Sequence, residues 1–244
     1  MQQFFVEQSS INGNKIILDE NDINHVVNVL RMKVGEKIRV SDNKNVSYYC
    51  HLVEISKEMV AAEIDEVDEV GTELYNEIYL FQGLPKGDKM ELVIQKAVEL
   101  GATKVIPTSM KNCVVKLDDK KAKNKQKRWQ TIAESAAKQA KRTIIPEVTM
   151  PMKYKDAMKF ASTLDVVLLP YENQRGMEAT REIIGKIKRG AKIGIFVGPE
   201  GGFAGDEITN LPGNVSLISL GRRILRTETA GLATLSMLVF CLDD

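Results

Sequence analysis

The first seventy residues show short runs of alternating apolar and polar positions, separated by turn-forming residues. A period of two is typical of a strand with one buried face. Only residues 19–31 of this region carry apolar side chains at helical spacing. Several short strands around one helix indicate a small barrel. The predicted strands are residues 15–18, 37–40, 48–55 and 59–64.

After Gly71 the pattern changes to short apolar runs that alternate with segments of helical periodicity. Such alternation is typical of an α/β fold with a mainly parallel sheet covered by helices on both faces. We therefore expect two domains, residues 1–71 and residues 72–244. The predicted strands are residues 78–83, 104–107, 164–169, 193–197 and 215–220, and the predicted helices are residues 88–100, 125–141, 176–189, 205–211 and 227–242.

The last predicted helix has no polar face, because residues 229–242 are all apolar, small or weakly polar. A helix that is apolar all round must be covered all round, and this one is shorter than the ~20 residues that span a bilayer. We expect one face to pack on the sheet and the other on a partner subunit, with Ala230, Gly231 and Ala233 permitting close approach. Burial wholly within one chain is the alternative.

Two glycine-bearing turns directly follow predicted strands near the C-terminus. They are Gly198-Pro199-Glu200-Gly201-Gly202-Phe203 and Leu220-Gly221-Arg222-Arg223-Ile224-Leu225-Arg226-Thr227-Glu228-Thr229-Ala230. Ligands of open α/β sheets bind beyond the carboxyl ends of strands, so these turns are candidate walls of one pocket. Neither fits a phosphate-binding glycine motif, and each contains a carboxylate. The pattern favours a nucleoside-like ligand with a neutral or cationic reactive end; two tight turns without a ligand are the alternative.

The cysteines and the N-terminal sequence indicate where in the cell the protein is located. Three scattered cysteines, Cys50, Cys113 and Cys241, lack the spacing of a metal site or a disulfide framework. The N-terminus does not resemble a signal peptide. We therefore expect a cytoplasmic protein without a metal centre.

The net charge of +1 conceals an uneven distribution. Residues 111–142 hold eleven lysines and arginines against three carboxylates, whereas residues 65–77 are strongly acidic. A basic segment of this kind attracts phosphate backbones through counterion release. It is either a nucleic-acid surface or a solvated lysine-rich loop.

The two glycine turns together resemble those of the RsmE family of ribosomal RNA uridine-N3 methyltransferases. The resemblance extends to Pro85-Lys86-Gly87-Asp88-Lys89-Met90, to residues 95–102 and 136–142, and to the N-terminal Phe4-Phe5-Val6. It implies a SPOUT-type, trefoil-knotted, mostly parallel sheet flanked by helices, preceded by a PUA-like RNA-binding β-barrel. It also implies S-adenosylmethionine as cofactor, 16S ribosomal RNA of the small subunit as substrate, a homodimer paired through the C-terminal helix, and no membrane association.

The resemblance also implies roles for residues of the turns. Arg226 is expected to stabilise the uracil anion, and Glu200 or Glu228 to accept the proton. The residues expected to hold the cofactor are Leu169, Gly198, Pro199, Glu200, Gly201, Leu220, Gly221, Ile224, Leu225 and Ala230.

RNA contacts are expected from a further set of polar residues. One departure from the family pattern is visible, because Gln3 stands where the family usually has Arg. Two other readings stay open: a different SPOUT enzyme that methylates a ribose 2′-oxygen or a transfer-RNA base, and a non-catalytic RNA-binding assembly factor. The expected RNA contacts are His25, Arg31, Lys86, Lys89, Gln139, Arg142 and Arg222.

Overall fold

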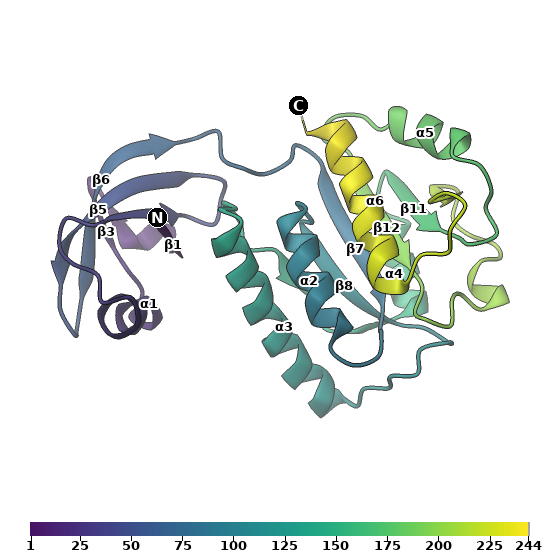
Figure 1. Ribbon diagram of the computed structural model, residues 1–244, viewed down its shortest axis with the longest axis horizontal. Helices are drawn as coiled ribbons and strands as arrows, with labels where there is room; N and C mark the ends of the chain where they lie inside the picture. Colours follow the sequence, from purple (N-terminus) through teal and green to yellow (C-terminus); the bar gives the residue numbers. More distant parts are fainter. Residues whose placement is uncertain (244) are drawn as a thin grey trace. The chain divides into compact units, whose positions relative to one another are not determined.

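The computed structural model describes residues 1–243, which form two compact units (Figure 1). The first unit contains Met1–Glu73 and Ala137–Ile145, and the second contains Leu74–Ala136 and the described residues from Pro146 onward.

A six-stranded sheet forms the first unit, in the order β1-β4-β5-β6-β3-β2. β1 pairs with β4 in parallel, and the other neighbours are antiparallel. Alternate side chains such as Ile16, Ile38 and Leu52 are fully buried in one core. The predicted strands are all present, and β1 and β2 are additional. Their bounds are β1 Gln2–Phe5, β2 Ile11–Asn12, β3 Lys15–Ile17, β4 Lys37–Ser41, β5 Ser47–Ile55 and β6 Val60–Asp68.

The predicted helix of residues 19–31 is present but is not a single α-helix. It consists of α1, Glu20–Asn24, and a π-helical turn, His25–Leu30, and a 3-10 turn at Gln8–Ser10 precedes it along the chain. Ile23 and Val26 face the core as the helical spacing predicted.

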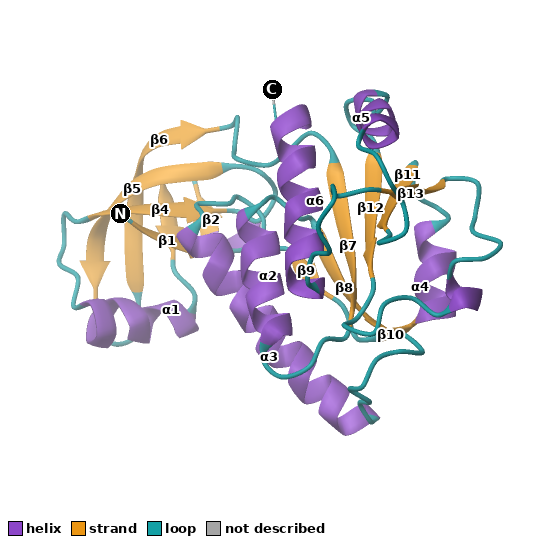
Figure 2. Ribbon diagram, turned by 45° about the vertical axis from the view of Figure 1, so that its right-hand side comes forward, coloured by secondary structure: helices purple, strands orange, loops and turns teal. Residues whose placement is uncertain are grey.

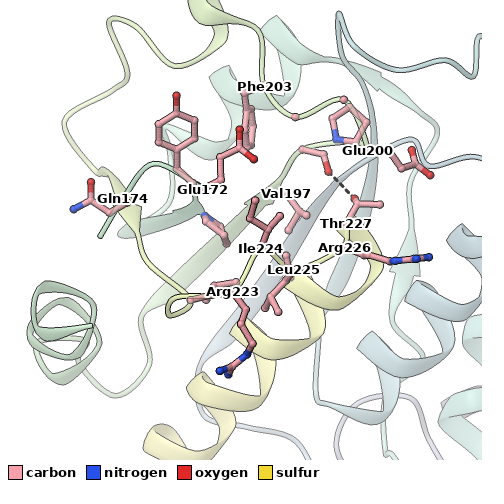
Figure 3. A pocket seen from close by; sticks show the side chains of 18 of the residues that line it. Glu172, Gln174, Val197, Glu200, Phe203, Arg223, Ile224, Leu225, Arg226 and Thr227 are labelled. Atoms are coloured by element: carbon pink, nitrogen blue, oxygen red, sulfur yellow. Dashed lines mark hydrogen bonds between the residues drawn. The ribbon is translucent and has the colours of Figure 1, made fainter. Parts of the chain in front are cut away.

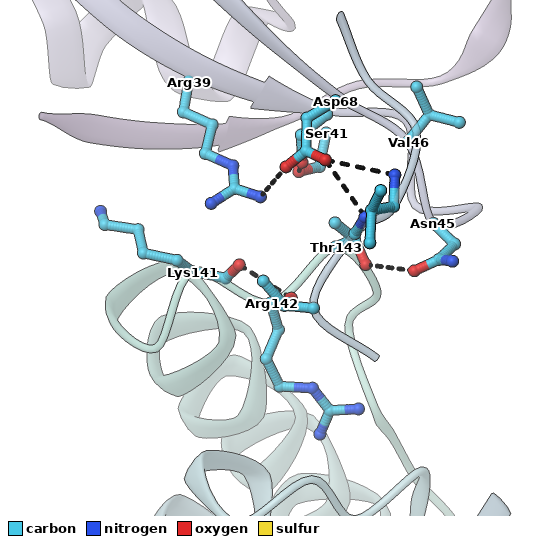
Figure 4. A network of polar contacts seen from close by, with 12 residues as sticks. Arg39, Ser41, Asn45, Val46, Asp68, Lys141, Arg142 and Thr143 are labelled. Atoms are coloured by element: carbon cyan, nitrogen blue, oxygen red, sulfur yellow. Dashed lines mark hydrogen bonds and ion pairs between the residues drawn. The ribbon is translucent and has the colours of Figure 1, made fainter. Parts of the chain in front are cut away.

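The segment 137–145 is tied to the sheet of the first unit by side-chain hydrogen bonds. The Gln3 side chain, which is 4% exposed, donates from Nε2 to the Arg142 carbonyl oxygen at 2.5 Å. The Arg142 guanidinium pairs with the Glu73 carboxylate. Thr143 donates from Oγ1 to Asn45 Oδ1 at 2.8 Å (Figure 4). Gln3 and Arg142 are thus structural partners within this unit.

The second unit contains a seven-stranded sheet in the order β10-β8-β7-β12-β11-β13, with β9 paired to β8. Every pairing is parallel, as the alternation of strands and helices predicted. The strands are β7 Glu77–Gly83, β8 Lys104–Ser109, β9 Glu147–Val148, β10 Met152–Lys153, β11 Val166–Pro170, β12 Lys192–Val197 and β13 Val215–Ile218.

Five α-helices and one 3-10 turn belong to this part of the chain (Figure 2). The helix predicted at residues 205–211 is wrong, since only a 3-10 turn, η3, forms there. Its Glu207 side chain instead accepts the backbone N–H groups of Lys111 and Ala204, at 3.0 and 2.8 Å. The helix α4 was not predicted. The bounds are α2 Lys89–Glu99, α3 Asp119–Gln139, α4 Tyr154–Ala161, α5 Glu178–Gly185, η3 Gly205–Glu207 and α6 Thr227–Leu242.

The two faces of this sheet are covered by different helices. On one face, the rings of Phe81 and Phe196 stack at 5.0 Å, and Phe160 of α4 meets Phe81 edge-on at 5.5 Å. On the other, α2 and α6 lie side by side (Figure 1). A Cβ on Gly231 would lie 3.3 Å from Leu80 and 3.4 Å from Val197. Gly231 therefore allows α6 to pack closely on the sheet of its own chain.

Candidate functional site

The strand order brings three loops to one edge of the second unit. β11 lies between β12 and β13, and all three run in the same direction. The loops that follow them enclose a pocket of about 500 Å³ (Figure 3). Its lining comes from residues 170–172, 174–175, 197–203 and 220–227, together with Lys89 and Ala230. The two glycine turns are therefore walls of one pocket, as the sequence predicted.

The first turn is latched to the start of α6 by a buried hydroxyl group. Thr227, which is 6% exposed, donates from Oγ1 to the Gly198 carbonyl oxygen at 2.6 Å. Gln82 of β7 donates from Nε2 to Thr227 Oγ1 at 2.8 Å. This relay fixes the backbone of the first turn relative to β7 and α6.

Close packing explains the glycines around this latch. A Cβ on Gly83 would lie 2.6 Å from the Pro199 nitrogen, and one on Gly198 would lie 3.2 Å from the Phe203 ring. Asn112 donates from Nδ2 to the carbonyl oxygens of Gly201 and Gly202 at 3.0 and 3.2 Å. The turn is thus held from β7, from β8's following loop and from α6.

The second turn presents apolar side chains to the pocket. Gly221 has φ +104°, a conformation that L-residues rarely adopt. Figure 3 shows Val197, Ile224 and Leu225 gathered at the cavity, whereas the guanidinium group of Arg226 points away from it. Ile224 is 82% exposed. An exposed aliphatic side chain in a concave site is well suited to contact a planar apolar ligand group.

Lys89, the first residue of α2, lies between two carboxylates at the pocket. Its Nζ is 3.0 Å from Glu200 Oε1 and 3.4 Å from Glu228 Oε2. Glu200 Oε1 also accepts the backbone N–H of Lys86 at 3.1 Å. Burial opposes ionisation of Glu200, but hydrogen bonds from Lys86, Lys89 and the Glu200 backbone, together with the charge of Lys89, lower its pKa overall. The hydrogen bond to Glu200 in turn raises the pKa of Lys89, so both groups are charged at neutral pH.

All but one of the predicted cofactor residues line this pocket. The exception is Leu169, which is fully buried in β11, and the neighbouring Pro170 lines the pocket instead. The residues brought together are Gly198, Pro199, Glu200, Gly201, Leu220, Gly221, Ile224, Leu225 and Ala230.

The predicted catalytic residues lie in or beside the pocket. Arg226 and Glu200 line it. Glu228 is the second residue of α6 and is not part of the lining; its Oε2 approaches Lys89.

The residues predicted to contact RNA are divided between the two units. Arg222 and Lys89 line the pocket, and the Lys86 side chain is exposed nearby in the chain. His25, Arg31 and Gln139 are exposed in the first unit. Arg142 is only 5% exposed because it pairs with Glu73.

The sequence reasoning missed most of the loop after β11, including Glu172, Gln174 and Arg175. The signal that could have identified it is strand order, because β11 is the neighbour of both strands that precede the glycine turns. Strand order is not visible in local periodicity.

The N-terminal half of α3 forms a second candidate surface. Its buried stripe contains Ala122 and Trp129, and lysines flank this stripe. Lys121 pairs with Asp118 and Arg128 with Glu91. Among residues 1–243, no ion pair involves the exposed Lys120, Lys123 or Lys127. This surface therefore carries an uncompensated positive charge.

Residues 1–243 contain neither a cluster of metal-binding side chains nor a membrane-spanning helix. This part of the chain has no group of three or more His, Cys, Asp or Glu side chains that could hold a metal ion. It also has no helix that is long and apolar enough to cross a membrane.

Comparison with known proteins gives consistent matches along the chain. Residues 72–239 match the family described as RNA methyltransferase domain, and residues 18–65 match the family described as RNA methyltransferase PUA domain. The ribosomal RNA small subunit methyltransferase E of Bacillus subtilis (strain 168) is 36% identical, over 98% of this chain and 96% of that protein. The protein of the same name from Mesomycoplasma hyopneumoniae (strain 232) is 33% identical, over 100% of both chains.

A solved structure is similar over nearly the same length. It is the ribosomal RNA small subunit methyltransferase E from Neisseria gonorrhoeae, bound to S-adenosyl methionine. The identity is 30%, the TM-score is 0.85, and the match covers 98% of this chain and 97% of that one.

Proposed function

Because the chain belongs to the family of ribosomal RNA small subunit methyltransferase E proteins, we propose that it methylates the N3 atom of one uridine in 16S ribosomal RNA. It is an S-adenosylmethionine-dependent methyltransferase of small-subunit ribosomal RNA, as its relatives are named and as a cofactor-bound member of the family indicates. The observation that carries the proposal is the pocket between the two glycine turns, which lies where three parallel strands end.

The lining of the pocket fits S-adenosylmethionine. Its volume of about 500 Å³ is within the usual range for small-molecule sites. Val197, Ile224 and Leu225 offer apolar contacts to an adenine ring, and the backbone of the turns offers amide and carbonyl groups to its edge. The lining carries both signs of charge, the carboxylates of Glu172 and Glu200 and five basic side chains. S-adenosylmethionine also carries both, a sulfonium cation and a carboxylate. The basic side chains are Lys89, Arg175, Arg222, Arg223 and Arg226. When bound, the cofactor supplies an electrophilic methyl group on a sulfonium.

The chemistry requires a uracil without its N3 proton. A bond forms between N3 and the methyl carbon as the carbon–sulfur bond breaks and its electron pair goes to sulfur. Most of the rate gain comes from holding these atoms in line. We assign stabilisation of the uracil anion to Arg226 and proton acceptance to Glu200 or Glu228. The guanidinium group of Arg226 points away from the cavity (Figure 3), so this role requires it to turn toward the base. Glu200 lines the pocket and Glu228 does not, but the lowered pKa of Glu200 makes it a weaker base than an ordinary glutamate.

RNA binding is proposed for two surfaces of the second unit. Arg222 lies on the pocket lining, and the exposed lysines of α3 are free to neutralise phosphates. Because N3 lies on the pairing edge of uracil, the target base must be unpaired or extruded before it reacts. Contacts from His25, Arg31 and Gln139 of the first unit remain part of the proposal.

We further propose that the enzyme is a homodimer paired through α6. The helix buries Thr234, Leu235 and Leu238 against its own unit. Phe240, by contrast, is 90% exposed, in the stretch 237–242 of the helix that carries no hydroxyl or charged side chain. Sedimentation velocity should give a dimer for the natural chain and a monomer for Phe240→Glu. A natural chain that sediments as a monomer, like the variant, would contradict the proposal. The cytoplasmic location stays a prediction from the cysteines and the N-terminal sequence, and the trefoil knot stays a prediction from the family resemblance.

The test of the proposed function is methyl transfer in vitro followed by nucleoside analysis. The protein is incubated with labelled S-adenosylmethionine and small ribosomal subunits, or their naked RNA, from a strain that lacks the enzyme. The expected product is 3-methyluridine at one position. Recovery of 2′-O-methyl nucleosides would favour a different enzyme of the superfamily, and tight RNA binding without transfer would favour an assembly factor.

A further inference from the structure

Three charged side chains form a compact cluster beside the cofactor pocket: Lys89, Glu200 and Glu228. The ammonium group of Lys89 is 3.0 Å from one carboxylate and 3.4 Å from the other. Their side chains are 33%, 27% and 15% exposed, in the same order. Each residue is therefore partly removed from water, where ion pairs are stronger than on an open surface.

The carboxylate of Glu228 is partly buried and lies beside Lys89. Its Oε2 atom is buried and has no hydrogen-bond partner that meets the usual geometry. Only the ammonium group of Lys89, at 3.4 Å, is recorded as an ion-pair partner among the described residues. A buried carboxylate oxygen without a partner carries a desolvation cost, so loss of the ammonium group would leave it uncompensated.

The cluster joins three segments that are far apart in the sequence. Lys89 begins α2, which follows β7. Glu200 lies in the first glycine turn, and Glu228 lies in the first turn of α6, where the second glycine turn ends. The last two segments form opposite walls of the pocket. The ammonium group of Lys89 is thus a second link between the first glycine turn and the start of α6, beside the hydrogen bond from Thr227 to Gly198.

We propose that Lys89 is a positioning residue of the cofactor site, whose ammonium group holds Glu200 and Glu228 together and so keeps the two glycine turns in their binding arrangement. The family resemblance instead suggested that Lys89 contacts RNA. The observed geometry favours the positioning role, because the ammonium group donates a hydrogen bond to Glu200 and forms an ion pair with Glu228. The inference rests on the proposed function only for the identity of the ligand, S-adenosylmethionine.

The experiment compares Lys89→Met and Lys89→Arg with Lys96→Met in the full-length protein. Lys96 is a matched control, because it also lies on α2 and pairs with a glutamate, Glu99, at 2.8 Å, but away from the pocket. Cofactor affinity is measured by calorimetry without RNA, and RNA affinity by anisotropy without cofactor. We expect Lys89→Met to weaken S-adenosylmethionine binding about 3- to 30-fold, Lys89→Arg to restore most of it, and Lys96→Met to have no effect. RNA affinity should be unchanged in all three.

A spectroscopic measurement separates positioning from a general loss of structure. Carbon-13 NMR of the glutamate carboxyl groups should show Glu200 titrating below the ordinary glutamate pKa in the natural chain. In Lys89→Met its pKa should rise, because one of its two hydrogen-bond donors is gone. Glu228→Gln offers a second test if Lys89→Met does not fold: it removes one counter-charge without changing shape, and should weaken cofactor binding by a smaller factor.

Two results would overturn the proposal. One is cofactor affinity in Lys89→Met and Glu228→Gln equal to that of the natural chain. The other is a loss of RNA affinity in Lys89→Met with cofactor affinity unchanged, which would make Lys89 an RNA contact. Failure of the proposed function is distinguishable, since the natural chain would then bind S-adenosylmethionine without producing 3-methyluridine.

Discussion

Replacement of Thr227 by valine removes the latch between the first glycine turn and α6 while keeping the shape of the side chain. The hydroxyl group donates to the Gly198 carbonyl at 2.6 Å and accepts from Gln82 at 2.8 Å, and the residue is 6% exposed. Valine can make neither bond. The Gly198 carbonyl loses this donor, whereas Gln82 Nε2 keeps its bond to the Gly83 carbonyl at 3.1 Å.

The expected loss of stability in Thr227→Val follows from the cost of leaving a buried polar group unpaired, which is about 1–3 kcal/mol per group. One unpaired carbonyl and one weakened amide give a loss of about 2 kcal/mol in the free energy of unfolding. For a domain of this size, that corresponds to a fall in melting temperature of about 4–8 °C. Cofactor affinity should fall about tenfold, because the turn that lines the pocket is no longer fixed.

Urea denaturation, thermal melting and calorimetric titration with S-adenosylmethionine check this reasoning. Thr234→Val is the matched control, because Thr234 is also buried on α6 but donates only to the Ala230 carbonyl of its own helix, at 2.8 Å. Loss of this hydrogen bond in Thr234→Val should lower the free energy of unfolding by less than about 1 kcal/mol and leave cofactor affinity unchanged. Equal effects of the two substitutions on stability and affinity would refute the latch.

Three further predictions address the pocket, the basic surface and the buried thiols. Gly198→Val should abolish cofactor binding but not RNA binding, because its Cβ would lie 3.2 Å from the Phe203 ring; unchanged calorimetric affinity would refute the pocket assignment. Lys123→Gln combined with Lys127→Gln should reduce the slope of log affinity for RNA against log salt by about 1.4–1.8, and an unchanged slope would show that these lysines do not meet phosphates. Burial raises the pKa of Cys50 to about 12, so at pH 8 only about one thiol in ten thousand is ionised. Mass spectrometry should therefore find Cys50 alkylated in urea but protected in the folded protein. Rapid labelling of Cys50 in the folded protein would contradict its burial.

Elements with strong local patterns could be predicted from the sequence. The strands β7, β11, β12 and β13 are short apolar runs, and α2 carries its buried residues at regular helical spacing. The helix α4 has a weaker signal, because its buried residues are the small Ala157 and Ala161. At residues 205–211, Glu207 turns inward to bond the backbone of a distant segment, and a tertiary contact replaces the expected helix.

Part of the pocket could also be predicted, because some of its lining lies in local sequence motifs. Its glycine turns are local motifs that follow apolar strands, so their residues were identified from the sequence. The ion pairs of Lys89 join residues separated by more than a hundred positions, and the attachment of residues 137–145 to the first unit depends on a bond from Gln3 to Arg142. No local periodicity carries such long-range contacts.

A crystal structure of the protein with S-adenosylmethionine tests the central claim most directly. The account predicts the adenosine between residues 197–203 and 220–227, against Ile224 and Leu225, with no phosphate or metal ion in the pocket. Cofactor bound elsewhere on the chain, or a pocket that stays empty at saturating cofactor, would contradict it.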